Sequence, residues 1–309
     1  MEQRSLGRSG LMVSVVGFGC GAVGGLMVKG TAADQQRAIA RALEAGITYF
    51  DTAADYGHGV SEQNLGAALR ALKADPVVGT KVRLAEAEYA SIGATIAASM
   101  DASLKRLGRQ QVHLFQLHNP IQATADAACM TPAMVEAEVL PAFARLREQG
   151  KALHFGFTAI GEPGPLRTVL SDGFMTSAQL PYNLLNGTVQ APLAAHAAAN
   201  QVGVIGIRTF AGGALSGSTA RGALGMQVVQ PIGSGASYAE DVAAAQRLRV
   251  LVDKGFAADL IEAALRFAIT TPHMATAMVG LGSLAELDHA IAAANKGPLP
   301  GEALALVGY

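Results

Sequence analysis

Tyr49-Phe50-Asp51-Thr52-Ala53-Ala54-Asp55-Tyr56-Gly57 is the stretch around which the chain is organised. We interpret residues 47–52 as a buried strand and the residues after Thr52 as a polar turn. Asp51 lies where the strand leaves the core, and Tyr56 follows far enough around the turn to face the same opening. The stretch is therefore predicted to form the floor of an active site.

The same order of strand and helix repeats along the chain. Buried strands are predicted at residues 15–19, 47–52, 77–82, 112–118, 153–158, 177–181, 204–210 and 276–280. Helices are predicted at residues 32–45, 62–73, 90–107, 132–149, 165–170, 190–200, 238–252, 257–270 and 284–294. Eight alternating units favour an α/β fold with a parallel sheet closed into a (β/α)8 TIM barrel.

Three further patterns refine this fold. Residues 4–14 alternate around two glycines and predict an N-terminal β-hairpin that closes the bottom of the barrel. Thr31 and Asp34 form a capping pattern for the first helix. The seventh connection is long and glycine-rich, through Gly212, Gly213, Gly217, Gly222, Gly225, Gly233 and Gly235, which is typical of a functional loop. No linker interrupts the pattern, so we predict one domain over residues 1–309.

Composition excludes several classes of protein. The chain is 50% hydrophobic and carries a formal charge of −1, which gives no field to attract nucleic acid or an anionic membrane. Residues 11–28 follow two arginines and are apolar, but five glycines interrupt them, so we do not expect a signal or membrane segment. Cys20 and Cys129 are expected to be buried thiols in a reducing compartment, which favours a cytoplasmic location. The oligomeric state is not readable from the sequence.

Two more polar residues join Asp51 and Tyr56 at strand ends. Lys81 closes the apolar run that begins at Val77, and His118 follows the strand that begins at Val112. Because the carboxyl ends of parallel strands meet on one face of a barrel, these side chains are predicted to converge. Tyrosine is a poor acid unless a cation favours its phenolate, and Lys81 can supply that cation, held charged by Asp51. The set suits protonation of a carbonyl oxygen as hydride arrives, or removal of a proton from an alcohol in reverse, with His118 either orienting the oxygen or helping to move the proton.

Other readings of these residues are weaker. Taken singly, Asp51 suits a helix cap, Tyr56 a loop aromatic, Lys81 a solvated strand end and His118 a backbone-bonded histidine, but four such residues on consecutive strands favour catalysis. No metal-ligand spacing and no Gly-x-Ser-x-Gly nucleophile motif is present. Residues 19–24 fit Gly-x-Gly-x-x-Gly, yet the next predicted helix begins only near residue 32, which argues against a Rossmann fold.

The chain resembles the aldo-keto reductase family over nearly its whole length. The matching pieces are residues 16–19, 50–53 with Tyr56 and Gly57, 61–62, 65–66, 80–82, 103–107, 117–118, Gln179 and 181–183. The resemblance implies a (β/α)8 barrel, a nicotinamide cofactor at the strand carboxyl ends, and a catalytic tetrad of Asp51, Tyr56, Lys81 and His118. It also implies that Tyr56 is the general acid, with direct hydride transfer to the carbonyl carbon.

The resemblance extends to the cofactor site with some departures. The implied cofactor-binding residues are Gly19, Cys20, Asp51, Thr158, Gln179, Arg208, Phe210, Gly213, Gly280, Gly282 and Glu286. Thr158 and Ala159 replace a serine and an asparagine that hold the carboxamide, and Ile207 or Arg208 occupies the place of a stacking tyrosine. An arginine at that place could stack through its guanidinium plane.

Gly280 and Glu286 stand where NADPH-specific members have a lysine and an arginine. Two charge-assisted bonds to a phosphate would be missing, and a glutamate can instead accept bonds from a free ribose diol. The sequence therefore favours NAD(H) over NADP(H), as in members similar to sugar and alcohol dehydrogenases. Aldehydes, ketones and sugars all remain open as substrates. A cofactor-binding, redox-sensing regulatory subunit with little turnover is the alternative function, which the intact tetrad disfavours.

Overall fold

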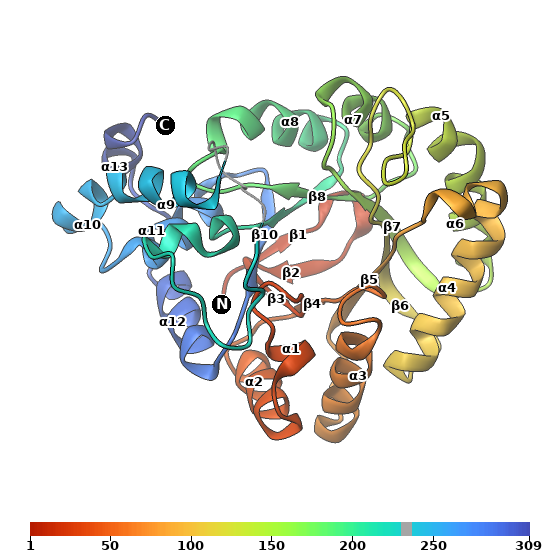
Figure 1. Ribbon diagram of the computed structural model, residues 1–309, viewed down its shortest axis with the longest axis horizontal. Coiled ribbons are helices and arrows are strands. Elements are labelled where there is room, and N and C mark those ends of the chain that lie inside the picture. Colours follow the sequence, from red (N-terminus) through yellow and green to blue (C-terminus); the bar gives the residue numbers. More distant parts are fainter. Residues whose placement is uncertain (230–236) are drawn as a thin grey trace.

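The computed structural model describes residues 1–229 and 237–309 and shows a closed barrel of parallel strands surrounded by helices (Figure 1). Around the barrel, β10 pairs with β3 and β9, and the remaining strands follow in chain order. The barrel strands are β3 (Val16–Gly19), β4 (Tyr49–Asp51), β5 (Val77–Val82), β6 (Val112–Leu117), β7 (Ala152–Thr158), β8 (Ser177–Pro181), β9 (Gly203–Ile207) and β10 (Met274–Gly280). The predicted (β/α)8 fold is confirmed, and the closed barrel excludes the Rossmann alternative.

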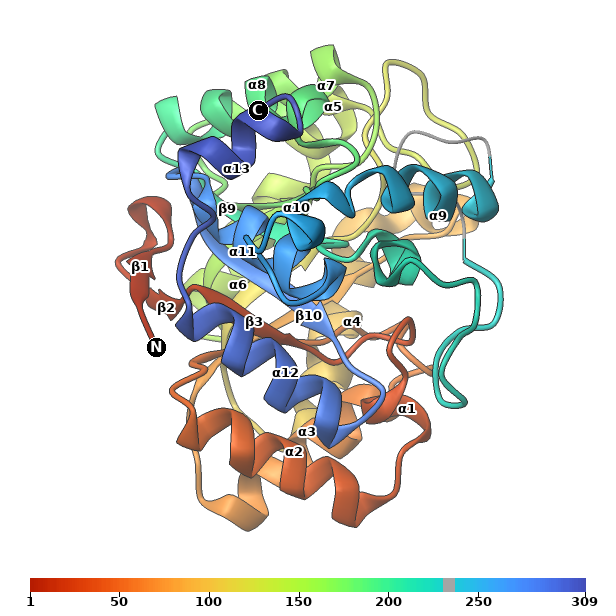
Figure 2. The same ribbon diagram turned by 90° about the vertical axis from the view of Figure 1, so that its left-hand side faces the viewer.

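The N-terminal hairpin covers the end of the barrel where the strands begin (Figure 2). Strands β1 (Gln3–Ser5) and β2 (Met12–Ser14) pair antiparallel, and a short 3-10 helix, η1 (Gly7–Ser9), lies between them. Leu6 and Val13 are completely buried in a small core that includes Tyr49, the first residue of β4. Burial of this apolar surface closes the bottom of the barrel, as the sequence predicted.

The outer layer consists of helices whose apolar faces cover the strands. They are α2 (Ala32–Glu44), α3 (Val60–Leu72), α4 (Ile92–Leu107), α6 (Leu140–Glu148), α7 (Pro163–Leu170), α8 (Gly187–Ala199), α11 (Leu260–Thr270) and α12 (Leu284–Asn295). Helix α2 begins as predicted, because the Thr31 hydroxyl accepts a hydrogen bond from the Asp34 N–H at 3.1 Å. Between the two layers Phe143 of α6 stacks on Phe155 of β7, with ring centroids 4.8 Å apart.

Further helical segments complete the outer layer. They are α1 (Leu26–Lys29), α5 (Pro132–Met134), α9 (Tyr238–Arg247), α10 (Val250–Asp253), α13 (Gly301–Leu306), the 3-10 helices η2 (Glu86–Ser91) and η4 (Ala211–Ser216), and the π-helical turn η3 (Val135–Val139). The single helix predicted over residues 132–149 is therefore three segments. Pro141 near the start of α6 has no N–H, so the regular hydrogen-bond ladder is interrupted there.

The sequence prediction that no helix directly follows residues 19–24 was wrong, because α1 begins at Leu26. This helix is only one turn long, and its first N–H donates to the carbonyl oxygen of Leu281 at 3.1 Å. That contact ties the loop after β3 to the loop after β10. The segment therefore joins two loops at the carboxyl end of the barrel and does not form the long first helix of a dinucleotide-binding βαβ unit.

The seventh connection leaves β9 and crosses the carboxyl end of the barrel. Its helix η4 contains Gly212 and Gly213, whose φ angles of 68° and 106° lie in the left-handed region that glycine adopts without a steric penalty. Gly233 and Gly235, which were part of the same prediction, lie outside the described residues. Within residues 1–229 and 237–309, no helix is long and apolar enough to cross a membrane.

Candidate active site

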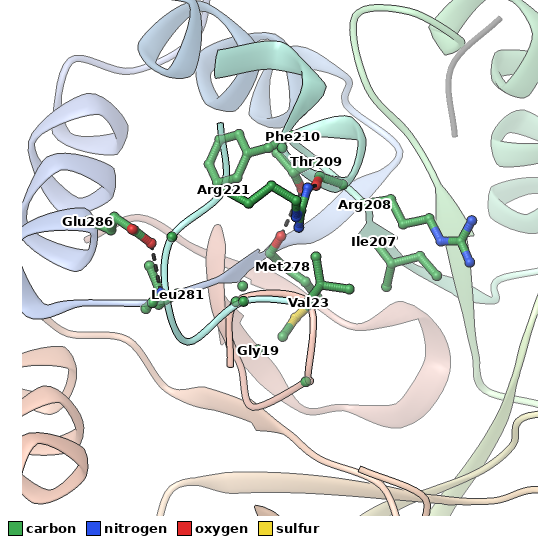
Figure 3. Close-up of a pocket in the computed structure, with 18 of the residues that line it drawn as sticks. Gly19, Val23, Ile207, Arg208, Thr209, Phe210, Arg221, Met278, Leu281 and Glu286 are labelled. Carbon is green, nitrogen blue, oxygen red and sulfur yellow. Dashed lines mark hydrogen bonds between the residues drawn. The ribbon is translucent and has the colours of Figure 1, made fainter. Parts of the chain in front are cut away.

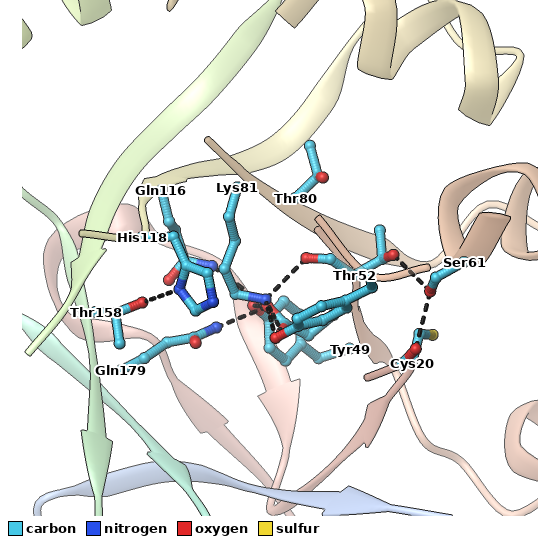
Figure 4. Close-up of polar contacts among 12 residues, drawn as sticks. Cys20, Tyr49, Thr52, Ser61, Thr80, Lys81, Gln116, His118, Thr158 and Gln179 are labelled. Carbon is cyan, nitrogen blue, oxygen red and sulfur yellow. Dashed lines mark hydrogen bonds and ion pairs between the residues drawn. The ribbon is translucent and has the colours of Figure 1, made fainter. Parts of the chain in front are cut away.

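The four residues predicted to converge, Asp51, Tyr56, Lys81 and His118, do so at the carboxyl end of the barrel. Figure 4 shows Lys81 and His118 among their neighbours. The Lys81 ammonium donates a hydrogen bond of 2.5 Å to Oδ2 of Asp51 and one of 3.1 Å to the Tyr56 hydroxyl. A third bond, of 2.8 Å, goes to the carbonyl oxygen of Thr52. In the β4–β5 pairing Asp51 lies opposite Gly79, so Lys81 is placed just beyond it, over the end of β4. The phenol, the ammonium and the carboxylate form a continuous polar chain.

Three neighbouring side chains hold the other oxygen of Asp51. Oδ1 accepts hydrogen bonds from the Tyr49 hydroxyl at 2.8 Å, from Gln179 Nε2 at 2.7 Å and from Gln116 Nε2 at 3.3 Å. Sequence reasoning missed Tyr49 and Gln116. Strand alternation could have identified both residues. Tyr49 precedes Asp51 by two residues and Gln116 precedes His118 by two, so each pair lies on the same side of its strand. The carboxylate is therefore fixed by its surroundings.

Burial and pairing determine the charges in this chain. Burial alone would lower the pKa of Lys81, but the adjacent Asp51 carboxylate and Tyr56 more than offset it, so the pKa is raised and the ammonium stays charged. Burial raises the pKa of Tyr56 above its usual value, with Lys81 opposing that effect. The phenol is thus protonated at neutral pH. Lys81 does not bring the Tyr56 pKa below normal, because the loss of hydration outweighs its attraction.

His118 lies beside Tyr56 and is electrically neutral. Its ring meets the Tyr56 ring edge-on with centroids 6.1 Å apart, and its Nδ1 is 2.7 Å from the Thr158 hydroxyl. Burial lowers the pKa of His118 well below its usual value, and the positive charges of Lys81, Arg83 and Arg208 lower it further. With Nδ1 engaged by Thr158, the other ring nitrogen, Nε2, remains for a molecule in the cavity.

A cavity of about 510 Å³ opens above these residues and is lined by Tyr56 and His118 as well as by Glu286 and His289. Figure 3 shows part of its wall, with Arg208 and Glu286 far apart. Most of the residues predicted to bind a cofactor line it. They are Gly19, Asp51, Gln179, Arg208, Phe210, Gly213, Gly280, Gly282 and Glu286. Strands on opposite sides of the barrel contribute these residues, so the tertiary structure brings together most of the predicted set.

Cys20 and Thr158 lie outside the wall of this cavity. Cys20 is fully buried, and its carbonyl oxygen accepts a hydrogen bond of 2.9 Å from Ser61. Burial, followed by the nearby Asp51 carboxylate, raises the pKa of the Cys20 thiol, so it is unreactive. Thr158 is also buried, and its hydroxyl contacts His118. Both residues therefore lie behind the cavity wall, next to residues of the site.

A segment of the glycine-rich seventh connection, which the sequence marked as a functional loop, crosses the cavity, and its contacts with the loop after β3 could not be predicted. The Arg221 guanidinium donates to the carbonyl oxygen of Gly212 at 2.6 Å and to the Tyr238 hydroxyl at 3.1 Å. Farther along, the Met226 N–H donates to the carbonyl oxygen of Val23 at 3.3 Å. Residues 221–226 thus connect the loop after β9 with the loop after β3. No local sequence signal marks this contact, because it joins segments far apart in the chain.

The end of the cavity near Glu286 is formed by the loop after β10 and the first turn of α12. The Glu286 carboxylate is exposed and accepts a hydrogen bond of 2.7 Å from the Gly282 N–H. His289, one turn later, is 3.0 Å from Oδ2 of Asp259. Gly280 leaves open space, because the closest atom to a Cβ placed there is the Gly24 nitrogen at 3.6 Å. This end thus presents a carboxylate and backbone groups.

No group of three or more histidine, cysteine, aspartate or glutamate side chains within residues 1–229 and 237–309 is arranged to hold a metal ion.

Comparisons with known proteins were consistent with one another. The sequence model of the aldo/keto reductase family matches residues 15–307. L-galactose dehydrogenase of Arabidopsis thaliana is 25% identical over 96% of this chain and 89% of its own length. L-glyceraldehyde 3-phosphate reductase of Escherichia coli is 31% identical over 72% of this chain and 65% of its own length. Among solved structures, the holo form of an aldo-keto reductase from Bacillus halodurans aligns with a TM-score of 0.76 and 25% identity, covering 99% of this chain and 95% of that one.

Proposed function

The chain belongs to the aldo/keto reductase family, and from that premise we propose that it interconverts an aldehyde, ketone or sugar carbonyl and an alcohol with Tyr56 as general acid and base. The family supports an oxidoreductase of carbonyl and alcohol groups that uses a nicotinamide cofactor. The roles of individual residues, the preferred dinucleotide and the substrate belong to the proposal.

One observation carries the proposal, namely the position of the Lys81 ammonium between the Tyr56 hydroxyl at 3.1 Å and the Asp51 carboxylate at 2.5 Å. A phenol that gives up its proton in a buried site becomes an unstable anion unless a cation lies beside it. Lys81 provides that cation, and Asp51 keeps Lys81 charged. The same three groups in a solvated loop would have no such effect, because water would screen them.

The proton moves between Tyr56 and the substrate oxygen. In reduction, the Tyr56 hydroxyl gives its proton to the carbonyl oxygen as hydride reaches the carbonyl carbon, and Lys81 stabilises the phenolate that forms. In oxidation, Tyr56 takes the proton from the alcohol. The raised pKa of Tyr56 keeps the phenol protonated, so the proton is available, and its release depends on the Lys81 ammonium that stabilises the phenolate. Neutral His118, positioned by Thr158, orients the substrate oxygen through Nε2.

The cavity residues fit a nicotinamide dinucleotide. Gly280 leaves room along the wall, because a Cβ there meets no atom closer than the Gly24 nitrogen at 3.6 Å, and a side chain at Gly21 would contact the Tyr56 ring at 3.5 Å. We propose that Gln179 and Arg208 hold the nicotinamide end, Phe210 and Gly213 the middle, and Gly280, Gly282 and Glu286 the adenosine end. When bound there, the cofactor supplies or accepts the hydride. Cys20 and Thr158 would act only indirectly, because neither lines the cavity.

We propose a preference for NAD(H) over NADP(H) from the charge at the adenosine end. The exposed Glu286 carboxylate would accept a hydrogen bond from a ribose hydroxyl, whereas it would repel a 2′-phosphate. His289 could offset that repulsion when protonated, but it already faces the Asp259 carboxylate at 3.0 Å. The charges at this end of the cavity therefore disfavour binding of the additional 2′-phosphate of NADP(H).

The test is to measure oxidation of NADH and NADPH with a panel of aldehydes, ketones and sugars, and the reverse reaction with alcohols, for the wild type and for Tyr56→Phe. We expect turnover to fall by about 10²- to 10⁴-fold in Tyr56→Phe, with the dissociation constant of the cofactor unchanged. Cofactor binding without turnover on any substrate, in both proteins, would favour a redox-sensing subunit instead.

A further inference from the structure

Two arginines stand beside the catalytic histidine and are not required by the proton chemistry. Arg83 directly follows β5, two residues after Lys81, so strand alternation directs it to the same side of the sheet, nearer the opening. Arg208 directly follows β9. Both line the cavity together with Tyr56 and His118. Figure 3 shows Arg208 pointing away from the end that carries Glu286.

The guanidinium groups have unused hydrogen-bond donors. Within the described residues, the Arg208 guanidinium forms no hydrogen bond or ion pair, and the side chain is exposed to the cavity. Arg83 uses one nitrogen, Nε, in a loose contact of 3.4 Å with Oδ2 of Asp55, and both side chains are nearly half exposed. Each guanidinium carries five N–H donors in a planar arrangement that matches an oxyanion.

The backbone at Arg208 gives an independent reason to assign its side chain a role. Its φ angle is 59°, a left-handed conformation that is unfavourable for residues other than glycine. The conformation is held because the Arg208 carbonyl oxygen accepts hydrogen bonds from Asn183 Nδ2 at 3.1 Å and from the Ala211 N–H at 2.7 Å. A glycine would fit this backbone better, so an arginine here is retained at a cost to stability, as happens at functional sites.

The positive charges around this end of the cavity are balanced only in part, because Asp55 lies 3.4 Å from Arg83 and no carboxylate of the described residues pairs with Arg208. Among the described residues of the wall, the carboxylates are Asp51 and Glu286. Asp51 is neutralised by Lys81, and Glu286 lies at the opposite end. The positive charges of Arg83 and Arg208 act on His118 strongly enough to lower its pKa. A positive field therefore covers the place where the substrate oxygen would lie.

We propose that the substrate carries an anionic group, a carboxylate or a phosphate, near its carbonyl, and that Arg83 and Arg208 bind this group. The inference rests on the proposed function and names the substrate class of the same site. Stacking of Arg208 on the nicotinamide is compatible with it, because a guanidinium can stack through its face while its N–H groups donate from the edge.

A binding experiment tests the proposal without turnover. The protein loaded with NADH is titrated calorimetrically with 4-hydroxybutanoate and with its neutral amide, two alcohols of matched size that cannot be reduced. We expect the anion to bind about 10- to 100-fold more tightly, the range of one or two charge-assisted hydrogen bonds. Equal binding of the two compounds, or binding of neither, would exclude the carboxylate, and together with a ratio near one for the phosphate pair in the kinetic experiment it would overturn the proposal.

A kinetic experiment separates the two arginines and the two kinds of anion. The ratio of kcat/KM is measured for 4-oxobutanoate against 4-oxobutanamide and for glyceraldehyde 3-phosphate against glyceraldehyde. We expect the ratio to exceed about tenfold for at least one pair and to fall towards one in Arg83→Gln and Arg208→Gln. The pair with the larger ratio identifies the carboxylate or the phosphate. Turnover of all four compounds with ratios near one would overturn this proposal and leave the proposed function intact.

Two controls distinguish recognition from folding. Arg37→Gln, an exposed arginine on α2, should leave both ratios unchanged. Arg208→Gly should be at least as resistant to thermal unfolding as the wild type, because it relieves the left-handed backbone, and it should still lose the preference for the anion. Loss of NADH binding in Arg208→Gln, together with equal losses on charged and neutral substrates, would assign Arg208 to the cofactor alone.

Discussion

The two ends of the cavity are built from different parts of the fold. At the catalytic end, Asp51 and Lys81 belong to neighbouring barrel strands, and their side chains are 6% and 0% exposed. At the adenosine end, Glu286 lies on the first turn of α12, is exposed, and contacts the Gly282 N–H of the preceding loop. The charged pair beside the proposed proton donor Tyr56 is thus fixed in the sheet, while the groups proposed to select a ligand lie where substitution costs little stability.

The largest effect should follow from removing the charge at the catalytic end. In Lys81→Met we expect kcat to fall by about 10²- to 10⁴-fold, because the Tyr56 phenolate loses its cation. The cofactor dissociation constant should match that of Lys254→Met, a change at an exposed surface lysine. Pre-steady-state kinetics and fluorescence titration measure the two quantities. A loss of cofactor affinity as large as the loss of turnover would show that the two ends are not separate.

The difference in burial between the Asp51–Lys81 pair and a surface ion pair should also appear in the free energy of unfolding. Asp51→Asn leaves the Lys81 ammonium buried without its partner, so we expect the free energy of unfolding to fall by about 3–5 kcal/mol. Asp34→Asn removes a carboxylate that pairs with Arg37 on the surface of α2, and its effect on the free energy of unfolding should be much smaller, because water screens exposed charges. Urea unfolding of the three proteins measures the difference. Similar losses in both variants would contradict the description of Asp51 and Lys81 as a buried pair.

At the adenosine end the expected effect is smaller and concerns choice of cofactor. In Glu286→Gln the ratio of the NADH and NADPH dissociation constants should shift about tenfold towards NADPH, which corresponds to roughly 1.4 kcal/mol. Glu302→Gln, on the exposed side of α13, is the matched control. If NADPH already binds the wild type as tightly as NADH, the preference argued from Glu286 is wrong.

The smallest expected effect is that kcat/KM shows no titration of His118. Because the pKa of His118 is well below its usual value, kcat/KM for reduction should stay level as the pH falls from 8 to about 6, past the ordinary histidine pKa of about 6.5. Below pH 6.5 His118 takes up a proton in the unfolded chain but not in the folded chain. The free energy of unfolding of the wild type should therefore fall with decreasing pH relative to that of His118→Gln. A change in kcat/KM centred near pH 6.5 that is absent in His118→Gln would show that the His118 pKa is not lowered.

Much of the catalytic end could be predicted from the sequence because it follows from local pattern. Strand alternation and strand–helix order place residues at the carboxyl ends of strands, and in a parallel barrel those ends meet. The positions of Asp51, Tyr56, Lys81 and His118 could therefore be inferred without coordinates. The role of Thr158 could not, because only the register between β6 and β7 places its hydroxyl against His118.

By itself, the sequence determined the order of the elements, the closed parallel barrel and the identity of the four polar residues at neighbouring strand ends. Only the tertiary structure decided which groups surround Asp51, that burial outweighs Lys81 at Tyr56, and that Arg83 and Arg208 face one cavity. The physical reason is that strand and helix patterns are short-range properties of the chain. Burial, hydrogen bonding and the field at a titratable group depend instead on distances between residues that are remote in sequence.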